Sequence, residues 1–225
     1  MRRILSGMLT GAMALAMVAR TSTKADAAFM AYICNDLACA GGGDVIVTDG
    51  GVGDGSAVVG AIIATGSVGG LTFTVNTAQS KPLIGSASSP SLDLTFTASG
   101  IGSAYFFASD TDFTGSGTVT GQIDGNFSGT SNVFAIIAGG TSNVNKDISN
   151  QSTLLSFFSS PFSGSTSLVV PAGANPYSLT LGILIERSSA GTTTGDFLLV
   201  PEPASMALFG LGLLGFGAAR RRRIV

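Results

Sequence analysis

Hydrophobic and polar residues alternate with a period of two along much of the chain between residues 28 and 200. Alternation of this kind predicts half-buried β-strands. It is clearest at 71–77, 91–99 and 177–186, where leucine, phenylalanine, valine and isoleucine take one face. The segment 153–158 is compatible with one helical turn or a short strand. Further strands are expected at 45–48, 57–64, 103–108, 117–123, 133–138 and 196–200.

Glycine, serine, asparagine and proline separate these segments, as in residues 81–90 and 169–176. No stretch of the body shows a convincing helical period. Eight to ten strands at this spacing favour an all-β fold, an antiparallel β-sandwich or a jelly-roll-like pair of sheets, with a β-solenoid as the alternative. Threonine and serine on the outer faces are expected to keep the sheets soluble without many charges.

The two ends of the chain differ from this body. Two arginines precede an uncharged run from Ile4 to Ala19, and Ala25-Asp26-Ala27 fits a small-x-small cleavage pattern. A basic start, an apolar stretch and such a cleavage pattern predict a secretory signal peptide over residues 1–27. The body, residues 28–200, is therefore expected to be one extracytoplasmic domain.

Three pieces follow one another at the other end of the chain. Pro201, Glu202 and Pro203 come first, and sixteen residues without a charge, 204–219, follow. As a transmembrane helix they would span about 24 Å, slightly less than a hydrocarbon core of about 30 Å. The third piece is a cluster of basic residues, Arg220, Arg221, Arg222 and Arg223. Basic residues next to a membrane segment stay in the cytoplasm, so this cluster would hold the C-terminus there.

This three-part tail resembles the PEP-CTERM sorting signal of Gram-negative bacteria. The resemblance covers residues 201–225 and implies recognition by an exosortase, a membrane processing enzyme that cleaves near Pro201-Glu202-Pro203. It also implies transient anchoring in the inner membrane, then a place at the cell surface or in the extracellular matrix, tied to exopolysaccharide and biofilm. The body is similar to PEP-CTERM proteins of unassigned role through CNDLACAGGGDVIVTD, SKPLIGSASSPSLDLTFTA, ASDTDFTGSG and NPYSLTLGI.

Composition narrows the chemistry that the body can perform. Three basic and eleven acidic residues between positions 28 and 200 give a net charge of −8, which disfavours a nucleic-acid partner. The chain has no histidine, the commonest general base and neutral metal ligand. It also lacks the nucleophile elbow and the phosphate-binding loop motifs. We therefore expect a protein without a cofactor and without catalytic activity, although a serine paired with Lys81 or Lys146 stays open.

Cys34 and Cys39 are the two cysteines of the chain. In an exported protein such a pair predicts a disulfide that closes a small loop. A redox motif would have two intervening residues rather than four, and a metal site would need further ligands.

Five aspartates are candidate ligands or catalytic groups. Asp44, Asp49 and Asp54 lie among glycines, which suits either calcium or plain turns, and the turn interpretation is favoured. Asp110 and Asp112 stand on one side of an extended segment, where paired carboxylates could serve a glycan hydrolase, a weak calcium site or a turn. The alternatives to a structural role are thus a carbohydrate- or calcium-binding adhesion module and a carboxylate-dependent glycan hydrolase.

Overall fold

A computed structural model describes residues 29–201, and these residues form twelve β-strands. The strands are β1 (Met30–Cys34), β2 (Val45–Thr48), β3 (Ala61–Val68), β4 (Leu71–Gln79), β5 (Leu92–Gly100), β6 (Gly102–Phe113), β7 (Gly117–Phe127), β8 (Ser131–Gly139), β9 (Leu155–Phe157), β10 (Phe162–Val170), β11 (Tyr177–Arg187) and β12 (Thr192–Pro201).

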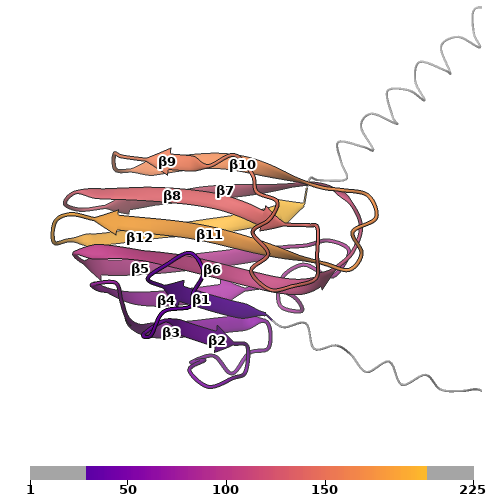
Figure 1. Cartoon of the computed structure of the whole chain (residues 1–225), viewed down its shortest axis with the longest axis horizontal. Helices are drawn as coiled ribbons and strands as arrows, with labels where there is room; N and C mark the ends of the chain where they lie inside the picture. Colours follow the sequence, from indigo (N-terminus) through magenta and orange to yellow (C-terminus); the bar gives the residue numbers. More distant parts are fainter. Residues whose placement is uncertain (1–28, 202–225) are drawn as a thin grey trace, which may run out of the picture.

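The strands form two six-stranded sheets stacked face to face (Figure 1). Sheet A has the order β2-β1-β6-β11-β8-β9, and sheet B has the order β10-β7-β12-β5-β4-β3. Neighbouring strands are antiparallel throughout. The expected antiparallel sandwich is confirmed, and the described residues do not form a solenoid.

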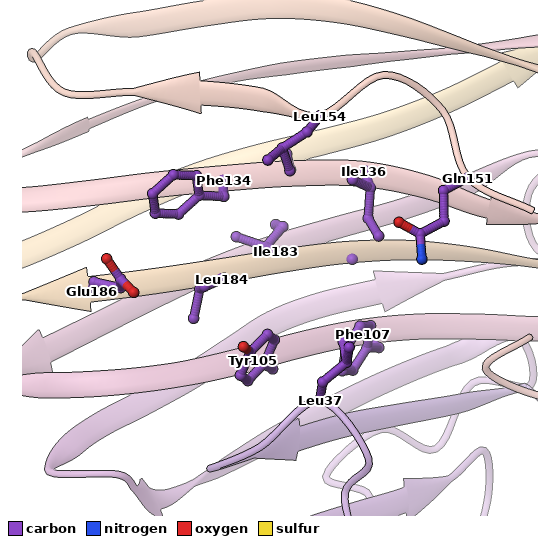
Figure 2. Close-up of a pocket in the computed structure, with 12 residues that line it drawn as sticks. Leu37, Tyr105, Phe107, Phe134, Ile136, Gln151, Leu154, Ile183, Leu184 and Glu186 are labelled. Carbon is purple, nitrogen blue, oxygen red and sulfur yellow. The ribbon is translucent and has the colours of Figure 1, made fainter. Parts of the chain in front are cut away.

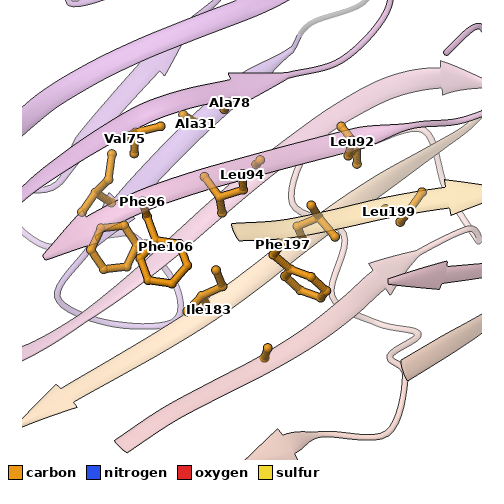
Figure 3. Packing of buried hydrophobic residues seen from close by; sticks show 14 of the residues in the cluster. Ala31, Val75, Ala78, Leu92, Leu94, Phe96, Phe106, Ile183, Phe197 and Leu199 are labelled. Atoms are coloured by element: carbon orange, nitrogen blue, oxygen red, sulfur yellow. The ribbon is translucent and has the colours of Figure 1, made fainter. Parts of the chain in front are cut away.

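One continuous apolar core lies between the two sheets (Figure 3). Phe106 of sheet A sits at its centre, with ring centroids 5.9 Å from Phe73 and 6.0 Å from Phe96, both on sheet B. Phe197 of β12 is also fully buried. Burying a phenylalanine side chain contributes roughly 1.5–3 kcal/mol, so these aromatic contacts hold the sheets together.

The outer faces of the two sheets differ. Sheet B presents threonine and serine, and hydroxyls pair across strands between Ser99 and Thr192 at 3.0 Å and between Thr120 and Ser167 at 3.0 Å. Cross-strand hydroxyl pairs satisfy each other and keep a sheet face polar without charge. Sheet A instead presents aromatic and aliphatic side chains, among them Tyr105. The expected hydroxyl-rich surface is therefore correct for sheet B and wrong for sheet A.

Some predicted strands are displaced or missed. The strand expected at 57–64 begins at Ala61, because Gly60 has a φ of +85° and a Cβ there would lie 2.8 Å from the Ser80 carbonyl oxygen. β1 and β10 were not expected, and the ambiguous segment 153–158 contains the short strand β9.

Both ends of the described chain lie at the same end of the sandwich (Figure 1). Met30 pairs with Ser109 of β6, and Pro201 pairs with Val119 of β7, close to the turn that joins those two strands. The predicted signal peptide (1–27) and transmembrane helix (204–219) lie outside the described residues. Within 29–201 no helix is long and apolar enough to cross a membrane.

Candidate functional site

A groove of about 320 Å³ crosses the outer face of sheet A (Figure 2). Its walls come from β6, β11 and β8 and from two loops. The lining is mainly apolar, and its principal side chains are Tyr105, Phe107, Phe134, Ile136, Leu154 and Leu184. Glu186 and Gln151 supply the charged and amide groups. An outward-facing apolar hollow on a sheet is the surface most suited to contact a ligand.

A glycine makes room for the groove floor. Gly182 of β11 stands opposite Phe107 of β6 and Ile136 of β8 in the strand register. A Cβ at this position would lie 3.1 Å from side-chain atoms of both neighbours, which is tighter than ordinary contact. Because Gly182 has no side chain, the side chains of Phe107 and Ile136 pack over it. The sheet face is therefore recessed at Gly182, between larger residues.

Aromatic rings flank this floor in two groups. The rings of Tyr105 and Phe107 are stacked, with centroids 6.1 Å apart and planes 7° apart. On the other side, Phe134 meets the exposed Phe158 edge to face at 5.9 Å. Flat aromatic faces next to a carboxylate and an amide can hold a ligand that has both apolar faces and hydroxyl groups.

The disulfide loop forms one wall of the groove. The predicted pairing of Cys34 with Cys39 is present, and Leu37 in the closed loop lines the groove. Lys146 Nζ donates to the carbonyls of Leu37 and Ala38, both at 2.8 Å, and lies 5.3 Å from the Phe107 ring centroid. Burial lowers the pKa of Lys146, while nearby acidic groups act in the opposite direction. The lysine thus fastens the loop to the sheet face.

Asp110 lies elsewhere, in a buried polar cluster. Its side chain has no exposed area and accepts hydrogen bonds from Ser80 Oγ at 2.5 Å and Lys81 Nζ at 2.8 Å. Lys81 also donates to the Thr111 carbonyl and lies 4.1 Å from the ring centroid of Phe113. Ser80 is fully buried as well. Ser80 and Lys81 thus share one carboxylate oxygen of Asp110, and of the three side chains only that of Lys81 keeps exposed area, 11%.

Asp112 and Asp110 contact different residues. Its backbone is left-handed, with a φ of +60°, and its carboxylate accepts from Asn143 Nδ2 at 2.7 Å. Its own N–H donates to Asn143 Oδ1. The expectation that the two carboxylates share one side of an extended segment is wrong. The unusual backbone turns Asp112 toward a loop, while Asp110 points into the protein.

Asp44, Asp49 and Asp54 accept hydrogen bonds from backbone N–H groups in loops. Asp44 accepts from Asn35 and Gly41, Asp54 from Gly50, Ser56 and Ile63, and Asp49 from Gly60 at 2.7 Å. Aspartate stabilises turns in this manner. Within residues 29–201, no three acidic or cysteine side chains are grouped so that they could hold a metal ion.

The structure also contains a carboxyl pair that was not predicted from the sequence. Asp93 of β5 and Asp196 of β12 interact on the outer face of sheet B. Burial raises the pKa of Asp93 to about 7, and the hydrogen bond to Asp196 and its charge add to this shift. The two residues are 103 positions apart in the sequence, so only the strand order brings them together.

The last strand leads into the C-terminal tail. β12 ends at Pro201, and residues 199–223 match the family model described as the PEP-CTERM protein-sorting motif. The chain carries this sorting motif. The match confirms the resemblance of the tail and begins inside the folded body, at Leu199. Glu202 and Pro203, for which a processing role was predicted, and the cluster Arg220–Arg223 lie outside the described residues.

Comparisons of the whole chain with known proteins add little to this. No curated protein matches the sequence. Among solved structures, TmCBM61 in complex with β-1,4-galactotriose has 10% identity and a TM-score of 0.36, covering 67% of this chain and 92% of its own. The enzymatically active domain of tailspike protein 4 of bacteriophage CBA120 has 12% identity and a TM-score of 0.33, and the match covers 60% of this chain and 18% of that one.

Proposed function

We propose that the protein is exported, anchored transiently in the inner membrane and processed by an exosortase, and then serves as a non-catalytic component of the cell surface or extracellular matrix. The sorting motif at 199–223 is the observation that carries this proposal. A PEP-CTERM motif is a signal for exosortase processing, and here it continues directly from the last strand of a folded domain. Association with exopolysaccharide belongs to the same proposal.

The geometry of the polar residues supports a non-catalytic role. Ser80, Lys81 and Asp110 form the most concentrated group of reactive types, yet Ser80 and Asp110 have no exposed area. Asp110 and Asp112 do not flank a common space, as glycan hydrolysis by two carboxylates would need. Both observations count against the hydrolase alternative.

Replacement of Pro201, Glu202 and Pro203 by alanine in the producing cells tests the proposal. Full-length protein should then accumulate in the inner membrane, while the parent chain is shortened and leaves it. A matched control is Val52→Ala, at a side chain that is 100% exposed and distant in sequence from the tail. Unchanged release of the alanine variant would overturn the proposal.

The groove on sheet A favours a second candidate function, the binding of carbohydrate. Aromatic faces such as Phe134 stack on the apolar faces of sugar rings, while Glu186 and Gln151 can accept or donate hydrogen bonds to hydroxyls. A glycan array probed with the purified protein, with Phe134→Ala and with Thr74→Ala on sheet B as control, tests this function. Signal that Phe134→Ala removes and Thr74→Ala retains supports it, whereas no glycan signal rejects it.

Calcium binding is the remaining form of the adhesion-module proposal. Calorimetry with calcium on the same purified protein tests it directly, and absence of heat rejects it. The loop aspartates Asp44 and Asp54 would be the ligands to change, since they lie at the protein surface and already hold glycine-rich loops.

A further inference from the structure

We propose that two copies of this chain join through the edge strand β10, so that their B sheets form one continuous sheet. β10 ends sheet B beside β7 and lies at the margin of the sandwich (Figure 1). An edge strand carries backbone N–H and carbonyl groups that no neighbouring strand takes, and such groups can pair with another chain. The surface lies wholly within the sandwich, so the inference does not depend on the sorting motif.

The other three edges of the described sandwich are short or covered. β2 has four residues and β9 has three. β3 is longer, but the loop beside it covers its edge, since Gly55 N–H donates to the Ile63 carbonyl at 2.8 Å and Ile63 N–H donates to Asp54 Oδ1 at 3.1 Å. Short edge strands and covering loops protect a sheet against pairing with another chain. Within residues 29–201, β10 is therefore the long edge that stays open.

The strand register and two hydrogen bonds show which backbone groups of β10 face outward. Successive residues of a paired strand direct their N–H and carbonyl groups to opposite edges. Phe127 N–H of β7 donates to Ser160 Oγ, on the β10 side, so the odd-numbered residues of β7 face β10. These residues stand opposite even-numbered residues of β10, which therefore bond to β7. The odd-numbered residues of β10 face outward, and accordingly the Val169 carbonyl accepts from Asn150 Nδ2 at 3.4 Å.

The outward edge is uncharged and regular. It consists of Ser163, Ser165, Ser167 and Val169, and their side chains are exposed as well. Among residues 29–201, no group bonds to the outward backbone of the three serines. The nine residues of β10 pair with β7 without a register shift, so no bulge turns the edge away. β10 also has no charged residue and no proline, the residues that usually block strand addition.

A second copy of the chain is the partner that fits this edge. Two identical antiparallel strands related by a two-fold axis need only one strand that is complementary to itself. With the axis at Thr166, Ser165 stands opposite Ser167 of the second copy, and each outward residue exchanges its N–H and carbonyl with the other strand. On the outer face, the hydroxyls of Thr120 and Ser167 already pair at 3.0 Å. The facing serines extend this row of hydroxyls across the axis.

Charge favours this edge over the rest of the surface. The body carries a net charge of −8, so two copies repel each other over most possible contacts. Like charges opposite each other on paired strands are destabilising, and β10 brings none together. The described sandwich has one such edge, so pairing closes with two copies and does not continue into a filament.

Cross-linking of the full chain in the producing cells tests the proposal. The two cysteines of the chain are joined in a disulfide, so Ser165→Cys introduces a single free thiol. With the axis at Thr166, the two Cα atoms at position 165 are about 8 Å apart, given strands about 4.8 Å apart and a rise of about 3.4 Å per residue, and a short bis-maleimide can join their thiols. The matched control is Gln122→Cys, at an exposed residue opposite Ser165 on β7. Its two copies would be three strand spacings apart, about 14 Å.

Ser165→Cys should give a cross-linked dimer in several-fold higher yield than Gln122→Cys. Absence of the dimer, or equal yields from both variants, would overturn the proposal, because the edge would then not be the contact. A cross-link from Ser165→Cys to a chain of different mass would also overturn it, since another protein would then occupy the edge.

Lysines placed on the edge provide a second test. Ser165→Lys/Ser167→Lys sets like charges opposite each other across the axis, while Gln122→Lys/Asn126→Lys adds the same charge at exposed residues one strand away. Light scattering of protein purified from the same cells should give the mass of two chains for the parent and the control and of one chain for the edge variant, with circular dichroism confirming the fold of each. A parent mass of one chain, or an edge variant that keeps two, contradicts pairing through β10.

Discussion

The buried ion pair of Lys81 and Asp110 should dominate the stability of its end of the sandwich. Asp110 has no exposed side-chain area and Lys81 has 11%, and their charged atoms are 2.8 Å apart. Asp110→Asn replaces the anion with a neutral amide and leaves the lysine charge without its counter-ion. Removing one partner of a buried pair costs about 3–5 kcal/mol, because the remaining charge stays desolvated.

That cost is large for a domain of this size. Single domains unfold with about 5–15 kcal/mol, so a loss of about 3–5 kcal/mol removes roughly a fifth or more of the domain's stability. For 150–250 residues each kcal/mol shifts Tm by about 2–4 °C, which gives a fall of roughly 10 °C. Urea unfolding and thermal unfolding of the mature protein, followed by far-UV circular dichroism, measure both quantities.

Asp112→Asn is the matched control, because asparagine also tolerates the left-handed backbone found there. The control should change stability by about 0.5 kcal/mol or less. The double variant Lys81→Met/Asp110→Leu removes both charges and should recover much of the loss seen in Asp110→Asn. Equal stability of Asp110→Asn and Asp112→Asn would refute the reasoning, since the buried ion pair would then contribute no more than the half-buried carboxylate of Asp112.

Three further predictions concern other parts of the fold. Asp93 holds its proton up to pH about 7 in the folded state, whereas its ordinary pKa is 3.8. The unfolded chain therefore releases this proton at lower pH than the folded protein does, and the free energy of unfolding should fall between pH 4 and 8. After screening by solvent the fall should be about 1–2 kcal/mol. Asp93→Asn should flatten this dependence in urea titrations, and an unchanged slope would contradict it. Reduction of Cys34–Cys39, or its replacement by serines, should cost about 2 kcal/mol, measured against the oxidised protein. Arg187, 3% exposed, donates to the carbonyls of Gly100 and Ser128, so Arg187→Lys should cost about 2 kcal/mol while Glu186→Gln costs little.

The strands that could be predicted from sequence are those with one covered face. In β4 and β5, leucine, phenylalanine and valine point into the core and threonine points out, so alternation survives. β10 was missed because Thr166, and Gly164 beneath the Phe157 ring, stand in its row of inward positions and interrupt the hydrophobic period. β1 was missed because its outer face is also covered, by the disulfide loop and Lys146, which leaves a wholly apolar run.

The sequence contains one indication of the groove, although it is not an alternating pattern. Residues 133–138 of β8 are apolar throughout, so both faces of that strand carry hydrophobic side chains. Such a run indicates either a doubly covered strand or an apolar outer face, and only the strand order decides between them. The contacts of Asp110 could not be predicted either, because its partners Ser80 and Lys81 lie 30 and 29 residues earlier in the sequence.

The position of β12 has a consequence for the order in which the chain can fold during secretion. β12 is the last described strand, yet it joins β7 to β5, so without it sheet B consists of two separate parts. Thr192 pairs with Ser99, 93 residues earlier, and contacts of such long range form late. We expect translocation to be nearly complete before the sandwich can close. The chain that crosses the membrane would then be incompletely folded, and pairing of β12 with β7 and β5 would complete sheet B.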